Sequence, residues 1–492
     1  MKLKHLFYHG NEQINFQKEL LNGFYLFIIA MVMIQWNADL LRTSFESDIF
    51  NAIIPVLLFM LCGFSGLFTL LQGLLFKKPL LVLPNLLLSV LIAVYGTYSM
   101  GYSINHVMIA AFIAILFSFL LFLLLPESWI QQLIPSSLSR LFPAILGLLL
   151  VIIGLIKAGF IIRFFKPDPS SLVSATSLSD WQFPFRAGYL FQPIPLLVIA
   201  GFILLGLTKK KSIFHSPWMI FILLTVIGFF IPVEWGRATA KGMVTSYQRF
   251  SFITSSLKPS NFSMFFTNWQ IASIKNFFNV LTPRSELIKL VFLFAVTFIF
   301  SQLHQFQTLQ QLWKKPGDDQ ETSSKTSLMT KKVYWMNHLY SFFGVSTNVA
   351  FFMTSAESGV AIDQSSHSGF SAVFSGLLLM AVACMIPLGF FSSQAGSSFL
   401  VLYLGFSLIN KGIQPLLQQK YTEWVAPVIF LLVTLFTFNP AEGLVMAILV
   451  DGVKRLANGI QEKQIKELLN PGFIISFILC ILYVCFFFIE RS

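Results

Sequence analysis

Long apolar runs separated by short polar turns follow one another along all 492 residues of this chain. Most runs approach or exceed the roughly 18 to 20 residues with which an α-helix crosses about 30 Å of hydrocarbon. The alternating pattern of β-barrel strands is absent, so the pattern predicts helices, which satisfy their own backbone hydrogen bonds in lipid. The predicted spans are 24–44, 52–76, 81–99, 104–125, 140–161, 194–208, 213–232, 285–311, 332–346, 348–362, 369–391, 395–409, 425–438, 440–456 and 472–489.

These spans fall into two series of seven, followed by one extra span. A repeat with an odd number of spans enters the membrane in the opposite sense, which gives the inverted repeat of many secondary transporters. The pattern predicts an all-α polytopic fold with four segments: a first repeat at 1–233, an extracytoplasmic connection at 234–284, a second repeat at 285–458 and a C-terminal turn and span at 459–492. The polar stretch 314–325 is expected to be a cytoplasmic linker.

The third and tenth spans are interrupted at the same place in their halves. The third begins with Pro84, Asn85 and Ser89, and the tenth reads TSAESGVAIDQSSHSG from Thr354. Discontinuous helices leave free helix ends near the bilayer midplane, where substrates and coupling ions bind in such transporters. We therefore expect the substrate site where these two spans meet.

Composition supports a membrane protein: 56% of the residues are apolar and 11% are charged, against roughly 25% charged in soluble domains. The net charge is +12, and small groups of Lys and Arg fall on turns that are cytoplasmic when the N-terminus is inside, as the positive-inside rule requires. Nucleic acid is therefore not an expected partner. We expect an inner-membrane, multi-pass protein without a cleaved signal peptide, and its four cysteines are expected to be packing residues.

Glu357 is the leading candidate site residue. An acid inside an apolar membrane segment costs roughly 2.5 to 3.5 kcal/mol on insertion scales and persists where it has a partner or a function. Glu357 could bind a proton or accept hydrogen bonds from substrate N–H groups. The alternative is a carboxylate at a helix end in the membrane interface, because polar residues follow it.

The eighth span supplies Gln302, Gln305 and His304. Gln302 and Gln305 lie three residues apart on one helix face, and their amides suit a heterocycle with donor and acceptor edges. The alternative is that they mark the cytoplasmic end of the span, where polar residues are tolerated. His304 could relay protons, although a solvated histidine near the interface is the simpler interpretation.

Other polar residues carry two interpretations each. Asp363 and the Ser365–His367 stretch could line a watery path or form a turn, while Lys157 and Glu442 could act, snorkel or cap. Motifs for nucleotide binding, zinc hydrolysis and serine hydrolysis are absent. We expect no enzyme activity, no cofactor and no metal.

Three strings in the chain resemble the xanthine/uracil permease family, in its adenine/guanine/hypoxanthine branch. They are ESGVAIDQSSHSGFSAV from Glu357, IGLIKAGF at 153–160 and NPAEGLVMAI at 439–448. The resemblance implies a seven-plus-seven inverted repeat with core and gate domains, and short strands in the third and tenth spans. It also implies a homodimer as a candidate assembly.

Carried over by position, the resemblance assigns substrate binding to Glu357, Ser358, Gln302, Gln305 and Ser89. Glu357 and His304 are the candidates for proton coupling. The family's two acids of the eighth span are amides at Gln302 and Gln305, so Glu357 would be the one remaining buried acid.

The leading hypothesis is proton-coupled uptake of a purine nucleobase or similar small heterocycle by alternating access. A second hypothesis keeps the fold and changes the cargo to an organic or inorganic anion, which the basic surplus and half-helix N-termini would attract. A third is a membrane sensor or scaffold without transport, because the motif acids are depleted.

Overall fold

The computed structural model describes most of the predicted spans as helices. The described residues are 16–41, 50–99, 102–126, 129–130, 132–163, 185–187, 191–207, 216–231, 238–239, 242–243, 285–313, 323–361, 368–385, 392–417, 424–437, 440–462 and 470–488. The predicted connection at 234–284 and most of the predicted linker at 314–325 lie outside them, apart from two short strands and the start of one helix.

The first half contains α2 (Phe16–Leu41), α3 (Phe50–Phe76), β1 (Val82–Pro84), α4 (Leu86–Val90), the π-helix η2 (Leu91–Ser99), α5 (Ile104–Leu124), α7 (Ser136–Ser139), α8 (Phe142–Ala158), β2 (Ile161–Arg163), β3 (Phe185–Ala187), α10 (Pro193–Leu207) and α11 (Pro217–Phe230). The strands β4 (Ala238–Thr239) and β5 (Gly242–Met243) follow. The second half contains α15 (Ser285–Trp313), α16 (Ser323–Ser346), β6 (Phe352–Thr354), α17 (Ser358–Ala361), α18 (Gly369–Met385), α19 (Gln394–Leu417), α20 (Val425–Thr437), α21 (Pro440–Glu462) and α22 (Pro471–Phe488).

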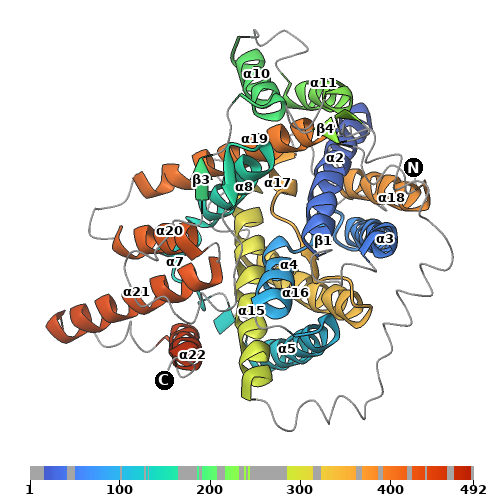
Figure 1. Ribbon diagram of the computed structural model, residues 1–492. Helices are drawn as coiled ribbons and strands as arrows, with labels where there is room; N and C mark the ends of the chain where they lie inside the picture. Colours follow the sequence, from blue (N-terminus) through green and yellow to red (C-terminus); the bar gives the residue numbers. More distant parts are fainter. Residues whose placement is uncertain are drawn as a thin grey trace.

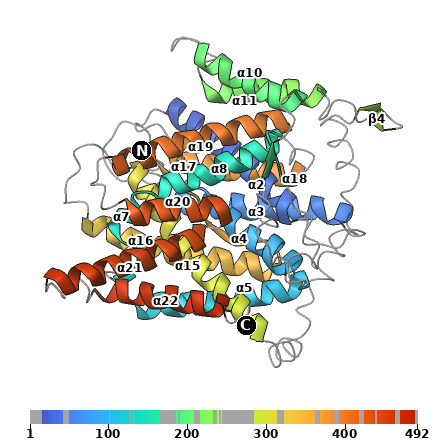
Figure 2. The ribbon, with the colours of Figure 1, turned by 60° about the vertical axis from the view of Figure 1, so that its left-hand side comes forward.

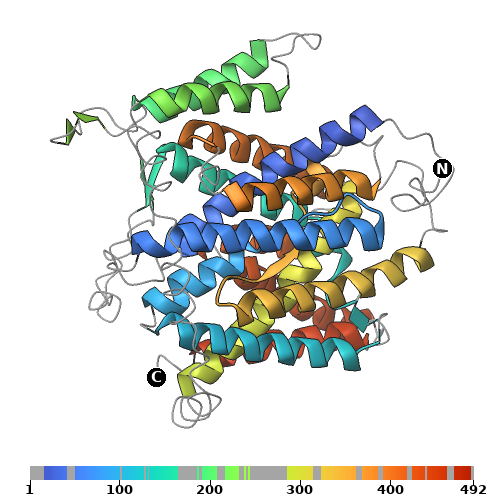
Figure 3. The ribbon, with the colours of Figure 1, turned by 90° about the vertical axis from the view of Figure 1, so that its right-hand side faces the viewer.

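Within the described residues, five helices are long and apolar enough to cross a membrane by length and composition, and several shorter helices are also apolar. Figure 3 shows the blue and orange helices running in nearly the same direction, as expected for a bundle that crosses one hydrophobic layer. Two predicted spans are too short. The span at 332–346 is the end of α16, and the span at 395–409 is the first part of α19, because both helices continue into polar sequence.

Helix packing repeats between the two halves, as an inverted repeat requires. The contact of α2 with α18 is matched by that of α15 with α5, and the contact of α3 with α18 by that of α16 with α5. The pairs β1–β6 and α8–α19 each join an element to its own counterpart. The seven-plus-seven fold is therefore confirmed, with α22 as the predicted extra helix; the residue boundaries given for the segments stay predictions.

Two groups of helices form the two parts of the bundle. In the first group, α2 to α5 pack with α15 to α18. In the second group, α8, α10 and α11 pack with α19, and α20 packs with α21. Figure 1 shows α15 between α20–α22 on one side and α2, α3 and α18 on the other. In Figure 2, α10 and α11 lie side by side at the outer edge. We call these groups the core and the gate, the two domains that the resemblance implies.

Small residues allow the closest helix crossings. A Cβ on Gly147 of α8 would lie 2.5 Å from the carbonyl oxygen of Gly405 in α19, and one on Gly66 of α3 would lie 2.8 Å from that of Gly376 in α18. In lipid, where apolar side chains gain little from leaving the solvent, close backbone approach of this kind is a main source of helix association. These crossings hold each group together.

Candidate functional site

The two interrupted spans meet through an antiparallel strand pair, as predicted. Val82 pairs with Thr354 and Pro84 with Phe352. Two further backbone bonds extend the pair, because Asn85 N donates to Phe351 O (2.8 Å) and Ser355 N to Leu81 O (2.8 Å). Each strand leads into a half-helix, β1 into α4 after one residue and β6 into α17 after the turn 355–357.

The outer edges of both strands are bonded by the neighbouring helices. Val82 N donates to Thr69 Oγ1 of α3 (3.0 Å), and Thr354 N donates to Asn337 Oδ1 of α16 (2.9 Å). Ser341 of α16 donates to Phe352 O (2.7 Å). A strand buried in a membrane protein has no water to satisfy its edge, so these polar side chains make the broken spans stable.

The start of α4 is fixed by two asparagines. Asn85 is its N-cap, and its Oδ1 accepts from Leu88 N (3.0 Å). Asn37 of α2 donates through Nδ2 to Pro84 O (3.2 Å), while no described group bonds its Oδ1. Because an N-cap satisfies only part of a helix start, the remaining amides keep a partial positive charge.

Glu357 lies between β6 and α17 and is buried, with 4% of its surface exposed. The hydroxyl of Ser355 donates to its carboxylate. Within the described ranges, no Lys or Arg forms an ion pair with it. Glu357 does precede the first residue of a helix, α17, as the alternative of a carboxylate at a helix end predicts. That helix end is buried inside the protein and is not exposed at its surface.

Gln305 and Ser358 lie close to Glu357 in the structure. Gln305 Oε1 accepts from Ala356 N (2.6 Å), the amide that precedes Glu357. Ser358 donates to Ser355 O (2.7 Å). Both side chains therefore position the turn that carries the carboxylate, through Gln305 Oε1 and the Ser358 hydroxyl.

Gln302 and Ser89 are different, because their buried polar atoms have no hydrogen-bond partner among the described residues. This holds for both amide atoms of Gln302 and for the hydroxyl of Ser89, and both residues are fully buried. They stand on α15 and α4, which contact each other. The alternative that Gln302 marks a solvated helix end is wrong, because α15 continues to Trp313 and Gln302 is inside the bundle.

His304 lies away from this turn, against the gate. Its Nε2 is 2.8 Å from Phe142 O of α8, and its ring packs edge-on against the Phe142 ring. A carbonyl only accepts, so Nε2 carries a proton. The simpler interpretation of His304 as a solvated residue is wrong, because only 8% of it is exposed.

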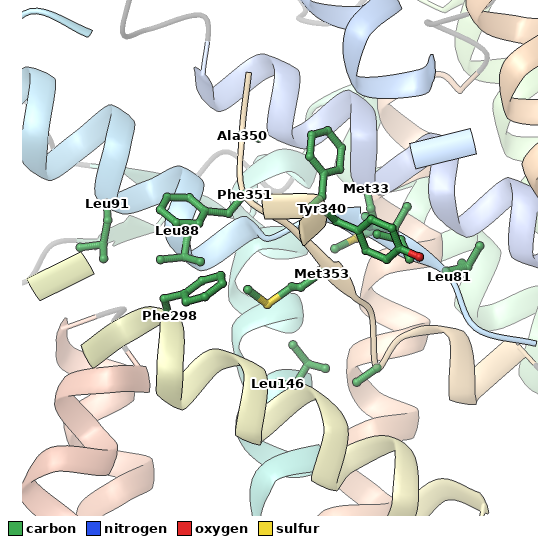
Figure 4. Close-up of a cluster of buried hydrophobic side chains, with 14 of the residues drawn as sticks. Met33, Leu81, Leu88, Leu91, Leu146, Phe298, Tyr340, Ala350, Phe351 and Met353 are labelled. Atoms are coloured by element: carbon green, nitrogen blue, oxygen red, sulfur yellow. The ribbon is translucent and has the colours of Figure 1, made fainter. Parts of the chain in front are cut away.

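An apolar cluster packs around the β1–β6 strand pair. Figure 4 shows Phe351, Leu88, Phe298 and Met353 lying together, with Leu91 and Leu146 nearby. The rings of Phe298 and Phe351 are 5.4 Å apart. This packing excludes water from one side of the strands, so polar atoms there depend on protein or substrate for hydrogen bonds.

Several buried polar residues were not predicted. Glu19 of α2 is 2% exposed and accepts from the hydroxyl of Ser371, and Asp451 pairs with Arg455 at 2.7 Å. The expectation that Glu357 is the one remaining buried acid is therefore wrong. Gln72 and Asn337 are also buried polar residues that were not predicted. The signal in the sequence was an amide side chain inside an apolar run.

Two further expectations concern the polar stretch after Glu357 and metal binding. Asp363 and the Ser365–His367 stretch lie outside the described residues. Within the described part of the chain, no group of three or more His, Cys, Asp or Glu residues could hold a metal ion.

Comparisons with known proteins give a likeness in fold. No family model and no curated protein matches the chain. The transmembrane domain of a cyanobacterium bicarbonate transporter, BicA, matches over 88% of this chain and 98% of its own, with 13% identity and a TM-score of 0.46. SLC26A9 matches over 87% and 66%, with 12% identity and a TM-score of 0.45. Murine Slc26a9, described as an anion transporter in the inward-facing state, matches over 90% and 70%, with 13% identity and a TM-score of 0.47.

These findings correct the resemblance to xanthine/uracil permeases. That assignment is wrong, because no family model matches and the solved structures that the chain resembles belong to a different family of transporters. The two families share the seven-plus-seven fold, which is why the fold prediction succeeded where the family prediction failed. The short motif strings were too weak to identify the family.

Proposed function

We propose that this chain is a secondary transporter of a small anion, which binds between the half-helices α4 and α17 and crosses with a proton on Glu357. Two buried residues carry this proposal, Gln302 of α15 and Ser89 of α4. Their side-chain polar atoms have no hydrogen-bond partner among the described residues. A buried donor without a partner is costly, so a bound anion that accepts from Gln302 Nε2 and from the Ser89 hydroxyl would satisfy these two donors.

The half-helices give this site a positive character. α4 continues into η2, so the two form one helical segment of fourteen residues. The positive end of its dipole lies at the N-cap Asn85. Helix N-termini attract anions through unbonded N–H groups and the aligned peptide dipoles. The net charge of +12 favours anionic solutes in the surrounding field.

Glu357 supplies the coupling. A carboxylate without a cation partner is expensive inside a membrane protein, and a negative Glu357 would repel an anion bound at α4. A proton on Glu357 removes both costs, so anion and proton would load and leave together. Alternating access would then come from movement of the core relative to the gate, as in other transporters of inverted-repeat design.

Flux measurements in proteoliposomes test the proposal. Wild type is assayed with bicarbonate, sulfate, nitrate and small carboxylates under an inward proton gradient, alongside Gln302→Leu and Glu357→Gln. We expect anion uptake by wild type, a rise of at least tenfold in KM for Gln302→Leu, and loss of the response to the proton gradient for Glu357→Gln.

Gln414→Leu is the matched control, because Gln414 is an exposed glutamine on α19; its uptake should equal that of wild type. Correctly inserted wild type that moves none of these anions would refute the proposal and favour a sensor or scaffold. Placement in the inner membrane with a cytoplasmic N-terminus is part of the same proposal, and accessibility labelling of cysteines introduced at the ends of α2 and α3 checks it.

A further inference from the structure

The amide of Gln302 offers an acceptor as well as a donor. Gln302 is fully buried, and neither its Nε2 nor its Oε1 has a hydrogen-bond partner among the described residues. An anion that only accepts would satisfy Nε2 and leave Oε1 without a donor. Turning the amide over exchanges the two atoms and presents the same pair, so one buried acceptor is left in either orientation.

The spacing of contacts along α15 shows which way Gln302 faces. The ring centroid of Phe298, four residues before it, lies 5.4 Å from that of Phe351, which precedes β6. Gln305, three residues after it, accepts from Ala356 N, which follows β6. Residues three and four apart share a helix face. Gln302 is therefore on the face of α15 that packs against β6.

The donors on that side of the helix are already used. The backbone N–H groups of residues 354, 355 and 356 donate to Asn337 Oδ1, Leu81 O and Gln305 Oε1, in that order. On α4, the N–H of Ser89 is bonded within the helix, and its hydroxyl forms no bond with Gln302. None of these described groups donates to Gln302 Oε1, so its donor has to come from the bound solute.

We propose that the anion carries this donor itself and is a small α-hydroxycarboxylate of the glycolate type. Its carboxylate accepts from Gln302 Nε2 and from the Ser89 hydroxyl, and its own hydroxyl donates to Gln302 Oε1. The hydroxyl and the carboxylate of such an acid are on adjacent carbons, so one oxygen of each can face the two atoms of the amide. Nitrate and sulfate have no hydrogen to donate. This inference rests on the proposed anion transport and names the substrate class of its site.

Glycolate and propionate are a matched pair, because a hydroxyl in one replaces a methyl in the other. Uptake of each radiolabelled acid is measured in proteoliposomes under an inward proton gradient, after subtraction of uptake by protein-free liposomes. We expect KM for propionate to exceed that for glycolate at least tenfold, because propionate leaves Oε1 buried without a donor. In Gln302→Leu the two KM values should agree within about twofold, because both bonds to the amide are lost. Gln414→Leu, at the exposed glutamine of α19, should keep the wild-type ratio.

A binding measurement separates this inference from the transport proposal. Sodium glycolate should stabilise the purified wild type against heat at a concentration at least tenfold lower than sodium propionate does, and Gln302→Leu should lose that difference, whether or not liposomes show flux. Equal effects of the two acids on wild type would overturn the inference and leave anion transport intact, with water as the donor to Oε1. Stabilisation by nitrate or sulfate and none by glycolate would also overturn it. If Gln302→Leu does not insert, the comparison of the two acids on wild type decides alone.

Discussion

Replacing Asn337 by alanine removes the acceptor for two donors of Thr354. Asn337 is 1% exposed, and its Oδ1 accepts from the backbone N–H of Thr354 at 2.9 Å and from its hydroxyl at 2.8 Å. The N–H is then left buried without a partner, which costs about 1 to 3 kcal/mol, and the lost hydroxyl bond adds about 1 kcal/mol. We therefore expect a loss of roughly 2 to 4 kcal/mol in the free energy of unfolding.

Unfolding in mixed micelles by SDS titration measures this change directly. Thr354→Val should cost less, because it keeps the backbone bond to Asn337 while losing the hydroxyl bonds to Asn337 and Gln72. The control is Ser346→Ala on the same helix, whose hydrogen bond to Phe343 O is exposed; we expect a change within about 0.5 kcal/mol. If Asn337→Ala also stays within that range, the strand edge is satisfied in another way and the reasoning about its buried bonds is wrong.

Three further outcomes follow from the packing. Gly405→Ala should destabilise by about 1 to 3 kcal/mol, because its Cβ would lie 2.7 Å from Gly147 O, whereas Gly206→Ala, with nothing within 4 Å, should be neutral or slightly stabilising by the same SDS titration. His304→Phe should cost about 1 kcal/mol through loss of the bond to Phe142 O while keeping the proton dependence of uptake; loss of that dependence would move the coupling from Glu357 to His304. Arg455→Ala should raise hydrogen exchange in α22, because Arg455 pairs with Asp451 and lies over the Phe473 ring at 4.7 Å; unchanged exchange would show that α22 is held by apolar packing alone.

The membrane class and the repeat could be read from the sequence because both depend on the position of apolar residues along the chain. Lipid requires long helices whatever their neighbours are, so the predicted spans agree with α3, α5 and α15 to within a few residues. The breaks at Pro84 and before Glu357 were visible for the same reason, because polar and helix-breaking residues interrupt an apolar run.

The family could not be determined in this way. The strings around Glu357, Lys157 and Glu442 resembled xanthine/uracil permease motifs, yet no family model matches the chain. Short strings of small and polar residues do not identify a family, because close helix crossings such as Gly147 with Gly405 require small residues for packing alone.

The roles of individual polar residues were decided by tertiary contacts. Gln302 and Gln305 look alike in sequence, but folding brings Ala356 N to Gln305, while the Gln302 amide has no hydrogen-bond partner in the part of the chain that the structure describes. The sequence favoured a membrane-interface position for His304, but in the fold its Nε2 contacts Phe142 O of α8. The apolar runs in the sequence determined which segments form apolar helices. Only the packing of the two halves determined which buried polar groups lack a hydrogen-bond partner among the described residues, because burial and hydrogen bonding depend on elements distant in the sequence.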